Sequence, residues 1–227
     1  MNDEGTPTLA LDGPVATITL RRPSQRNSLT DDDLQTLLRH CAQLDADAAV
    51  RVVVLTAETG GHARPVFSAG YHLGGLDGEG QGPQLFEQIP VALEALRPVT
   101  VCALNGSVYG GATDLVLACD LRLALAGCEW RMPAAALGFH YYPSGLRRYV
   151  TRLGLDGAKR AFLTARALPV EQLAALGLFE AVVTAQAFDA ARDELVARVA
   201  ALAPLAAQAT KRSLNEIGAG DYDVPRL

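Results

Sequence analysis

The segment Asn105-Gly-Ser-Val-Tyr-Gly-Gly-Ala-Thr-Asp114 is the most informative stretch of this 227-residue chain. The six residues before it, Val99–Leu104, are mostly apolar and β-branched, which predicts a strand covered on both faces. Gly110 and Gly111 then open a predicted helix, whose first backbone N–H groups lack partners and whose dipole favours negative charge. The segment therefore predicts a place where an anion could be stabilised, although such turns also serve close packing alone.

A second small-residue turn lies earlier in the chain, in Val66-Phe-Ser-Ala-Gly-Tyr71. Ser68, Ala69 and Gly70 allow the backbone to approach its neighbours closely. The backbone N–H of Tyr71 could then point into a cavity. Taken singly, this turn is again compatible with packing alone.

Hydrophobic periodicity around these turns predicts a mixed first part and a helical second part. Residues 15–20 alternate as a half-buried strand does, residues 50–55 read as a buried strand, and Thr30 stands at the expected N-cap of a helix. A further helix is predicted over 84–96. After residue 140, Ala- and Leu-rich segments predict helices over 145–153, 156–164, 170–176, 187–202 and 204–217, with stops at Gly154, Gly177 and Gly218. We expect an α/β core of residues 1–140 and a helical subdomain of residues 141–227.

Composition excludes several classes of protein. Hydrophobic residues make up 49% of the chain and charged residues 20%, which excludes wholesale disorder, and a net charge of −5 disfavours nucleic-acid binding. No apolar run is long enough to span a membrane, and the acidic N-terminus does not read as a secretory signal. Four cysteines without a CxxC pair predict buried thiols in a reducing, cytoplasmic compartment, and four scattered histidines predict no metal site.

In this order and spacing, the two turns resemble those of the crotonase superfamily, the enoyl-CoA hydratase/isomerase fold. The likeness extends from Ala16 to about Asn215 and includes further motifs, which are Arg22-Pro-Ser-Gln-Arg-Asn-Ser-Leu29, Cys119-Asp120, Leu137-Gly138, Gly145, Arg148, Gly154 and the segment 204–215. The resemblance implies a crotonase-like ββα spiral with a shortened helical C-terminal subdomain that forms trimers or hexamers.

The resemblance also implies a reaction centre. In the family, two backbone amides surround a thioester carbonyl, and the matching positions here are Tyr71 and Gly111. An acyl-CoA or acyl-carrier-protein thioester reacts through an enolate, whose oxygen such preorganised donors stabilise. No cofactor is implied beyond the coenzyme A moiety of the substrate.

Two positions distinguish this chain from family hydratases, which use two glutamates to hold and activate water. The first glutamate position falls on Asp114, and the second falls on Ala134, which cannot transfer a proton. The methylmalonyl-CoA decarboxylase branch also has alanine at the second position, and it has a tyrosine near the reacting carboxylate that matches Tyr141. Decarboxylation needs no base, and a glutamate 4 Å from a substrate carboxylate would repel it by roughly 4 kcal/mol at an effective dielectric constant of 20.

The preferred prediction is therefore decarboxylation of a malonyl- or methylmalonyl-type thioester, with Tyr71, Gly111, Asp114 and Tyr141 as catalytic residues. The alternatives are a hydratase or isomerase with Asp114 as its one acid/base, and an inactive acyl-CoA-binding or scaffold protein. Candidate substrate-binding residues are Arg26, Arg64, Ala69, His72, Gly110, Ala134 and His140. The two arginines are suited to the phosphates of CoA.

Overall fold

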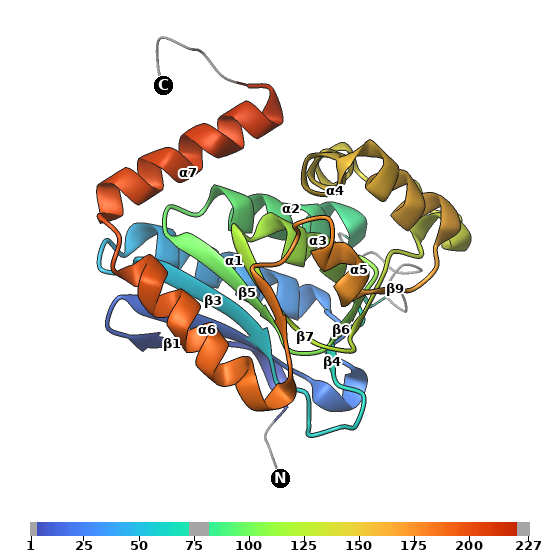
Figure 1. The fold of residues 1–227 in the computed structure, drawn as a ribbon, viewed down its shortest axis with the longest axis horizontal. Helices are drawn as coiled ribbons and strands as arrows, with labels where there is room; N and C mark the ends of the chain where they lie inside the picture. Colours follow the sequence, from blue (N-terminus) through green and yellow to red (C-terminus); the bar gives the residue numbers. More distant parts are fainter. Residues whose placement is uncertain (1–3, 73–81, 222–227) are drawn as a thin grey trace.

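The computed structural model describes residues 4–72 and 82–221. Its main sheet has six strands in the order β1-β2-β3-β5-β7-β10 (Figure 1), with β1 antiparallel to β2 and the other neighbours parallel. The strand bounds are Gly5–Asp12 for β1, Val15–Arg21 for β2, Val52–Ala57 for β3, Val99–Leu104 for β5, Leu121–Leu125 for β7 and Ala181–Val183 for β10.

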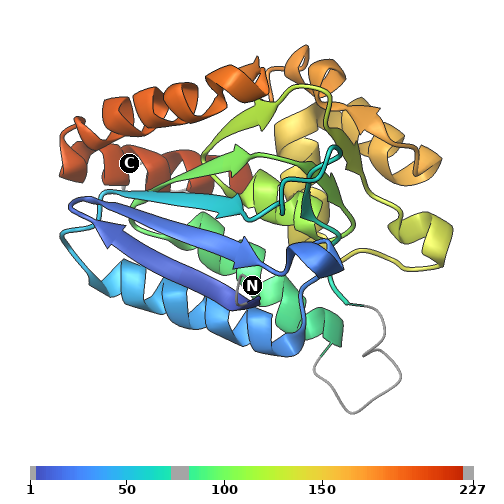
Figure 2. The same ribbon diagram turned by 90° about the horizontal axis from the view of Figure 1, so that it is seen from below.

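Helices cover both faces of this sheet, which explains the almost wholly apolar strands. Val53 and Leu55 of β3 belong to the main core with α1 (Asp31–Ala46) and α2 (Gly82–Ala95). Val52 and Val54 point the other way and pack against α6 (Ala185–Ala200). Figure 2 shows α1 on one side of the sheet and α6 on the other. Alternate residues of one strand thus enter two separate cores.

A second, four-stranded sheet positions both small-residue turns. Its order is β4-β6-β8-β9, with bounds Val66–Ser68, Ser107–Tyr109, Glu129–Arg131 and Leu168–Pro169. β4 and β6 are parallel neighbours, so the turns that follow them lie side by side. The turn after β6 leads into α3 (Ala112–Ala118).

After residue 140, the described chain contains the predicted helices and two unpredicted strands. Residues 145–153 and 156–164 lie in α4 (Pro143–Thr164), which consists of two helical parts separated by a kink at Gly154, where φ is 69° and ψ is 166° and the backbone is not helical, so the predicted stop is confirmed. α5 spans Val170–Ala174 and α7 spans Pro204–Ala219, so α7 passes through Gly218 and ends with Gly220 as its C-cap. The predicted stop at Gly218 is wrong because Gly220 takes the left-handed conformation. β9 and β10 are short and lie in segments with little alternation. The division at residue 140 remains a prediction.

Other local predictions can be compared directly with the structure. Thr30 caps α1 in a capping box with Asp33, and β1 is a strand that the sequence did not predict. Two short 3-10 turns, η1 (Pro23–Gln25) and η3 (Ala134–Leu137), complete the elements described below. All four cysteines are buried and free.

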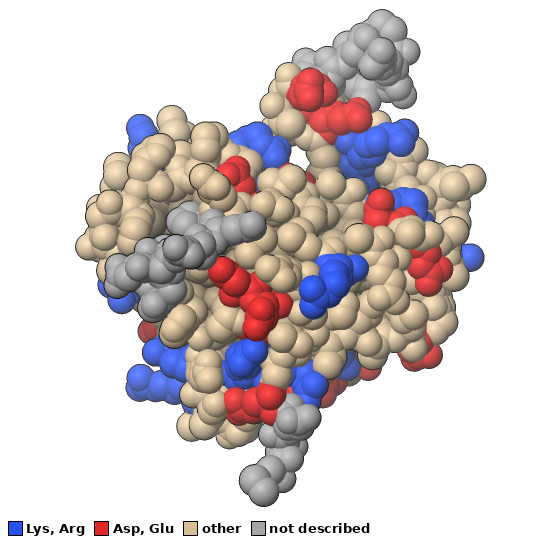
Figure 3. All heavy atoms as spheres, turned by 180° about the vertical axis from the view of Figure 1, so that it is seen from behind, with Lys and Arg blue, Asp and Glu red and all other residues tan. Residues whose placement is uncertain are grey.

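Surface charge is mixed on the face seen in Figure 3, where basic and acidic side chains are interspersed among neutral ones. In the segments 4–72 and 82–221, the helices are too short or too polar to cross a bilayer.

Lys211 anchors α7 to the sheet. Its Nζ lies 2.7 Å from Oδ2 of Asp120 and donates to the carbonyl oxygen of Pro98 at 2.8 Å. We expect Lys211→Met to lower the free energy of unfolding by about 3 kcal/mol, since it leaves a largely buried carboxylate without its cation. Urea unfolding measures this loss. Arg212→Met changes an exposed neighbour on the same helix and should cost less than about 0.5 kcal/mol; equal losses in both variants would contradict the anchor.

Candidate active site

The backbone amides of Tyr71 and Gly111 lie next to each other. A Cβ on Gly70 would be 3.0 Å from the nitrogen of Gly111 and 2.7 Å from the carbonyl oxygen of Tyr109, so only glycine fits between the two turns. Gly70 also has a φ of 88°, which disfavours other residues. This close approach brings the N–H of the following residue, Tyr71, to the start of α3.

Neither amide is used within the described parts of the chain. Leu29 N donates to Gly70 O at 2.9 Å, and His72 N donates to Leu29 O at 2.9 Å. Leu29 therefore bonds to the residues before and after Tyr71 and leaves the N–H of Tyr71 itself unused. Gly111 is the N-cap residue of α3, where a backbone N–H has no intrahelical acceptor. Among the residues described, no acceptor is found for either N–H group. Two adjacent free donors are what an oxyanion hole requires.

One wall beside these donors is aromatic. A Cβ on Gly111 would be 2.6 Å from Cζ of Phe86, and the rings of Phe86 and Tyr71 meet edge to face with centroids 6.1 Å apart. Phe86 is buried. An apolar neighbour lowers the local dielectric constant and so strengthens any hydrogen bond that the two amides make.

The side chain of Tyr71 is occupied elsewhere. Its hydroxyl donates to Oδ1 of Asp31 at 2.8 Å. Burial, and then the hydrogen bond to Asp31, raise the pKa of Tyr71 to about 12, so its phenol stays protonated at neutral pH. Tyr71 can therefore offer its backbone N–H to the site without offering an acid.

Asp114 lies one helical turn after Gly111 and is completely buried. Arg148 makes a bidentate contact with the Asp114 carboxylate, with Nε donating to Oδ1 and Nη2 donating to Oδ2, each at 2.8 Å. The hydroxyl of Tyr142 donates to Oδ2 at 2.6 Å. Both carboxylate oxygens are thus engaged by the protein itself, which favours a structural over an acid–base role for Asp114.

The charge of Arg148 is shared with a second carboxylate. Its Nη1 donates to Oε2 of Glu94 at 3.1 Å, and Glu94 also pairs with Arg147. The side chains of Arg148 and Asp114 are both 0% exposed, whereas that of Glu94 is 13% exposed. Two cations and two carboxylates therefore form a chain that runs from α3 to α2, and their charges balance.

Tyr141 is joined to this network through Tyr142. The two hydroxyl oxygens are 2.9 Å apart, and the rings stack with centroids 4.2 Å apart. The ring of Tyr141 lies directly against Gly145, where a Cβ would collide with it. Burial, and then the negative charge of Asp114, raise the pKa of both phenols. Both tyrosines are therefore hydrogen-bond donors rather than acids near neutral pH.

The structure brings some of the other candidates to this centre and leaves others apart. Ala69 and Gly110 form the two turns themselves, and Ala134 begins the turn η3, which packs against α4. His72 and His140 are exposed. The guanidinium of Arg26 lies 5.2 Å from the ring centroid of Tyr109, close to the turn after β6, and Arg64 is exposed. Tyr142 and Glu94 were not predicted; two adjacent tyrosines before Pro143 were the available signal for Tyr142.

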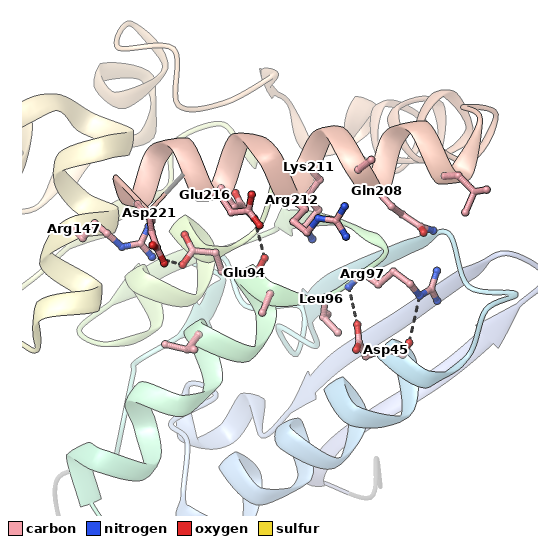
Figure 4. Close-up of a pocket in the computed structure, with 16 residues that line it drawn as sticks. Asp45, Glu94, Leu96, Arg97, Arg147, Gln208, Lys211, Arg212, Glu216 and Asp221 are labelled. Atoms are coloured by element: carbon pink, nitrogen blue, oxygen red, sulfur yellow. Dashed lines mark hydrogen bonds and ion pairs between the residues drawn. The ribbon is translucent and has the colours of Figure 1, made fainter. Parts of the chain in front are cut away.

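A pronounced hollow of the structure lies elsewhere. A cavity of about 670 Å³ runs beneath α7 (Figure 4), and Arg97, Arg147, Arg212 and Glu216 are among its lining residues. Neither Tyr71 nor Gly111 lines it. We therefore place the reaction centre by the backbone donors rather than by this cavity. Within the described segments, no three His, Cys, Asp or Glu side chains are grouped as metal ligands would be.

Comparison with known proteins decides the family. The family profile described as enoyl-CoA hydratase/isomerase matches residues 11–219, nearly the whole chain. The chain belongs to the enoyl-CoA hydratase/isomerase family. The resemblance predicted from the two turns is thereby confirmed, and the crotonase fold with it.

Individual members of the enoyl-CoA hydratase/isomerase family give the range of similarity. "Probable enoyl-CoA hydratase echA6" of Mycobacterium tuberculosis is 31% identical over 208 residues, which cover 90% of this chain and 80% of that protein. A Thermobifida fusca protein named as an enoyl-CoA hydratase has been solved in complex with CoA, and it matches with a TM-score of 0.83 at 33% identity. The match covers 97% of this chain and 87% of that protein.

A methylmalonyl-CoA decarboxylase solved with 2-nitronate-propionyl-CoA has a TM-score of 0.87. Its identity is 22%, with 97% of this chain and 85% of that chain covered, so this likeness shows the fold alone.

Proposed function

We propose that this protein decarboxylates a malonyl- or methylmalonyl-type CoA thioester. The observation that carries the proposal is the pair of adjacent backbone N–H groups, at Tyr71 and Gly111, that lack acceptors in the described chain. They would bind the thioester oxygen, on which negative charge develops as the reaction proceeds. One donor of this kind is worth roughly 3–4 kcal/mol of barrier in other enzymes.

The reaction needs an electron sink and no base. The bond between the α-carbon and the carboxyl group breaks, its electron pair passes into the thioester as an enolate, and neutral CO₂ leaves. The α-carbon then takes one proton from water. The product is the thioester with hydrogen in place of the carboxylate.

Asp114 and Ala134 favour this reaction over hydration. Hydration needs carboxylates that hold and activate water, but Asp114 is held by Arg148 and Tyr142, and Ala134 has no functional group. Most of the named relatives are hydratases, among them the 2,3-dehydroadipyl-CoA hydratase of Escherichia coli. Hydration is therefore the outcome that a direct assay has to distinguish.

CoA recognition and self-association belong to the same proposal. Arg26, beside the turn after β6, and Arg64 are basic groups that could meet the phosphates of CoA. Large apolar side chains stand exposed on α4 and α7, with Leu163 75% and Leu205 80% exposed. Such surfaces are typical of association between subunits, and we propose a trimer or hexamer in the cytoplasm.

The direct test supplies methylmalonyl-CoA and crotonyl-CoA to the purified protein. We expect CO₂ release from the first and no hydration of the second. Efficient hydration without CO₂ would favour the hydratase alternative, and tight acyl-CoA binding with no turnover would favour the scaffold alternative.

Ala134→Glu tests the role of the missing carboxylate in the same assay. We expect the decarboxylation rate to fall by about 100-fold or more, because a second carboxylate near the substrate's own would repel it by several kcal/mol. Ala135→Glu is the matched control, since Ala135 is an exposed neighbour in the turn η3. Equal rates in both variants would refute the repulsion.

A further inference from the structure

Tyr141, Tyr142 and Asp114 form a hydrogen-bonded chain whose direction the surrounding charges determine. Arg148 is a permanent donor and makes a bidentate contact with Asp114, so both oxygens of Asp114 act as hydrogen-bond acceptors in this chain. The single proton of the Tyr142 hydroxyl therefore goes to Asp114. Glu94 orients Arg148 from its other side.

This direction determines the role of the Tyr141 hydroxyl in the chain. The two tyrosine hydroxyls are in hydrogen-bond contact, and Tyr142 has no second proton to give. Tyr141 must then be the donor in that contact. The proton that could hold a substrate carboxylate is thus already bonded, to the oxygen of Tyr142.

We propose that Tyr142 is a positioning residue whose hydroxyl oxygen accepts the hydrogen bond of Tyr141 before substrate binds and competes for that hydrogen bond with the substrate's carboxylate. The inference rests on the proposed function, in which Tyr141 binds that carboxylate. A carboxylate is a stronger acceptor than a neutral phenol, so the Tyr141 proton turns to the substrate when it binds. The Tyr141 hydroxyl donates to Tyr142 again as the departing carboxyl group becomes neutral CO₂.

This change of hydrogen-bond partner affects the rate, because Tyr141 bonds to the substrate carboxylate in the ground state and to Tyr142 in the transition state. In the bound ground state, the bond to the carboxylate is offset by the lost bond to Tyr142. In the transition state, the carboxylate loses charge and the bond to Tyr142 re-forms. An interaction that is stronger in the transition state than in the ground state raises kcat, whereas one that is equal in both does not.

Phenylalanine substitutions at the two adjacent positions should have opposite effects on ligand binding. The probes are the S-carboxymethyl and S-ethyl thioethers of CoA, which share the nucleotide and differ in the carboxylate. We expect Tyr142→Phe to bind the carboxymethyl compound about fivefold more tightly, and Tyr141→Phe about fivefold more weakly. Binding of the ethyl compound should stay within about twofold in both variants.

Each variant removes one largely buried hydroxyl, so each controls for the other. Tyr149→Phe is a third control, because the Tyr149 hydroxyl pairs with Thr113 and is not part of the hydrogen-bonded chain of Tyr141, Tyr142 and Asp114. The affinities of the Tyr149→Phe variant for both compounds should stay within about twofold. The double variant Tyr141→Phe/Tyr142→Phe should behave as Tyr141→Phe does. Calorimetry measures all the affinities without turnover.

Kinetics supply the second readout. In Tyr142→Phe, kcat and KM for methylmalonyl-CoA should fall together by about fivefold, which leaves kcat/KM nearly unchanged. A lower kcat/KM at constant KM, or unchanged or weakened carboxymethyl binding, would overturn the role of Tyr142 while decarboxylation stands. Opposite shifts in carboxymethyl binding without any CO₂ release would overturn decarboxylation and keep the exchange as a means of carboxylate recognition.

Discussion

Gly70→Ala should lower kcat for CO₂ release by about 100-fold or more, the loss expected when an oxyanion donor is displaced. The added Cβ would lie 2.7 Å from Tyr109 O and 3.0 Å from Gly111 N, and both are backbone atoms that cannot rotate away. One turn must therefore move away from the other. Because the backbone N–H groups of Tyr71 and Gly111 belong to these turns, their separation changes even if the chain still folds.

The control for Gly70→Ala must carry the same backbone strain without the contact. Gly127 has a φ of 78°, and a Cβ there would meet nothing within 4 Å. Gly127→Ala should lose about 1–2 kcal/mol of stability and keep its kcat. Steady-state kinetics and thermal unfolding of both variants separate the two effects. A Gly70→Ala protein with normal kcat would contradict the placement of the oxyanion hole.

Arg148→Met should lower the free energy of unfolding by about 3–5 kcal/mol, enough to unfold a marginally stable domain. Arg148 is 0% exposed and pairs with Asp114, which is also 0% exposed. The substitution keeps most of the volume but takes this cation from a buried carboxylate, and among the described residues the Tyr142 hydroxyl is then its remaining partner. Urea unfolding followed by circular dichroism measures the loss.

Two further variants make the Arg148 experiment specific. Arg192→Met removes two ion pairs on the surface of α6, whose carboxylates are 80% and 68% exposed, and it should cost less than about 1 kcal/mol. Adding Asp114→Asn to Arg148→Met removes the unpaired charge and should restore part of the stability. A loss below about 1 kcal/mol in Arg148→Met would mean that the buried pair does not support the fold.

Local sequence signals predicted the parts of the fold that local physics determines. The start of α1 follows from Thr30 and the aspartates after it, and β5 was predicted with its observed bounds. β10 could not be predicted in this way, because a segment of three half-buried residues becomes a strand only by pairing with β7. The break in α4 at Gly154 was predicted as a helix stop, because glycine readily takes a positive φ that other residues avoid.

In the candidate site, too, features set by local sequence could be predicted and features set by tertiary contacts could not. The two turns and their glycines are visible in the sequence because close backbone approach requires small residues. The engagement of Asp114 was not visible, since Arg148 lies 34 residues away and Glu94 is on another helix. Sequence reasoning named Asp114 for what a carboxylate can do, and the tertiary contacts show what this carboxylate already binds.

The core between the sheet and α6 also has a consequence for how the protein is made. Val52 and Val54 lie on a sheet face covered by Phe188, Val196 and Val199, which a ribosome adds more than 130 positions later in every case. A growing chain that folds its first strands early therefore exposes these valines until α6 has been synthesised. Slow translation of the last third, or a shortage of chaperones, should then divert this protein into aggregates during expression.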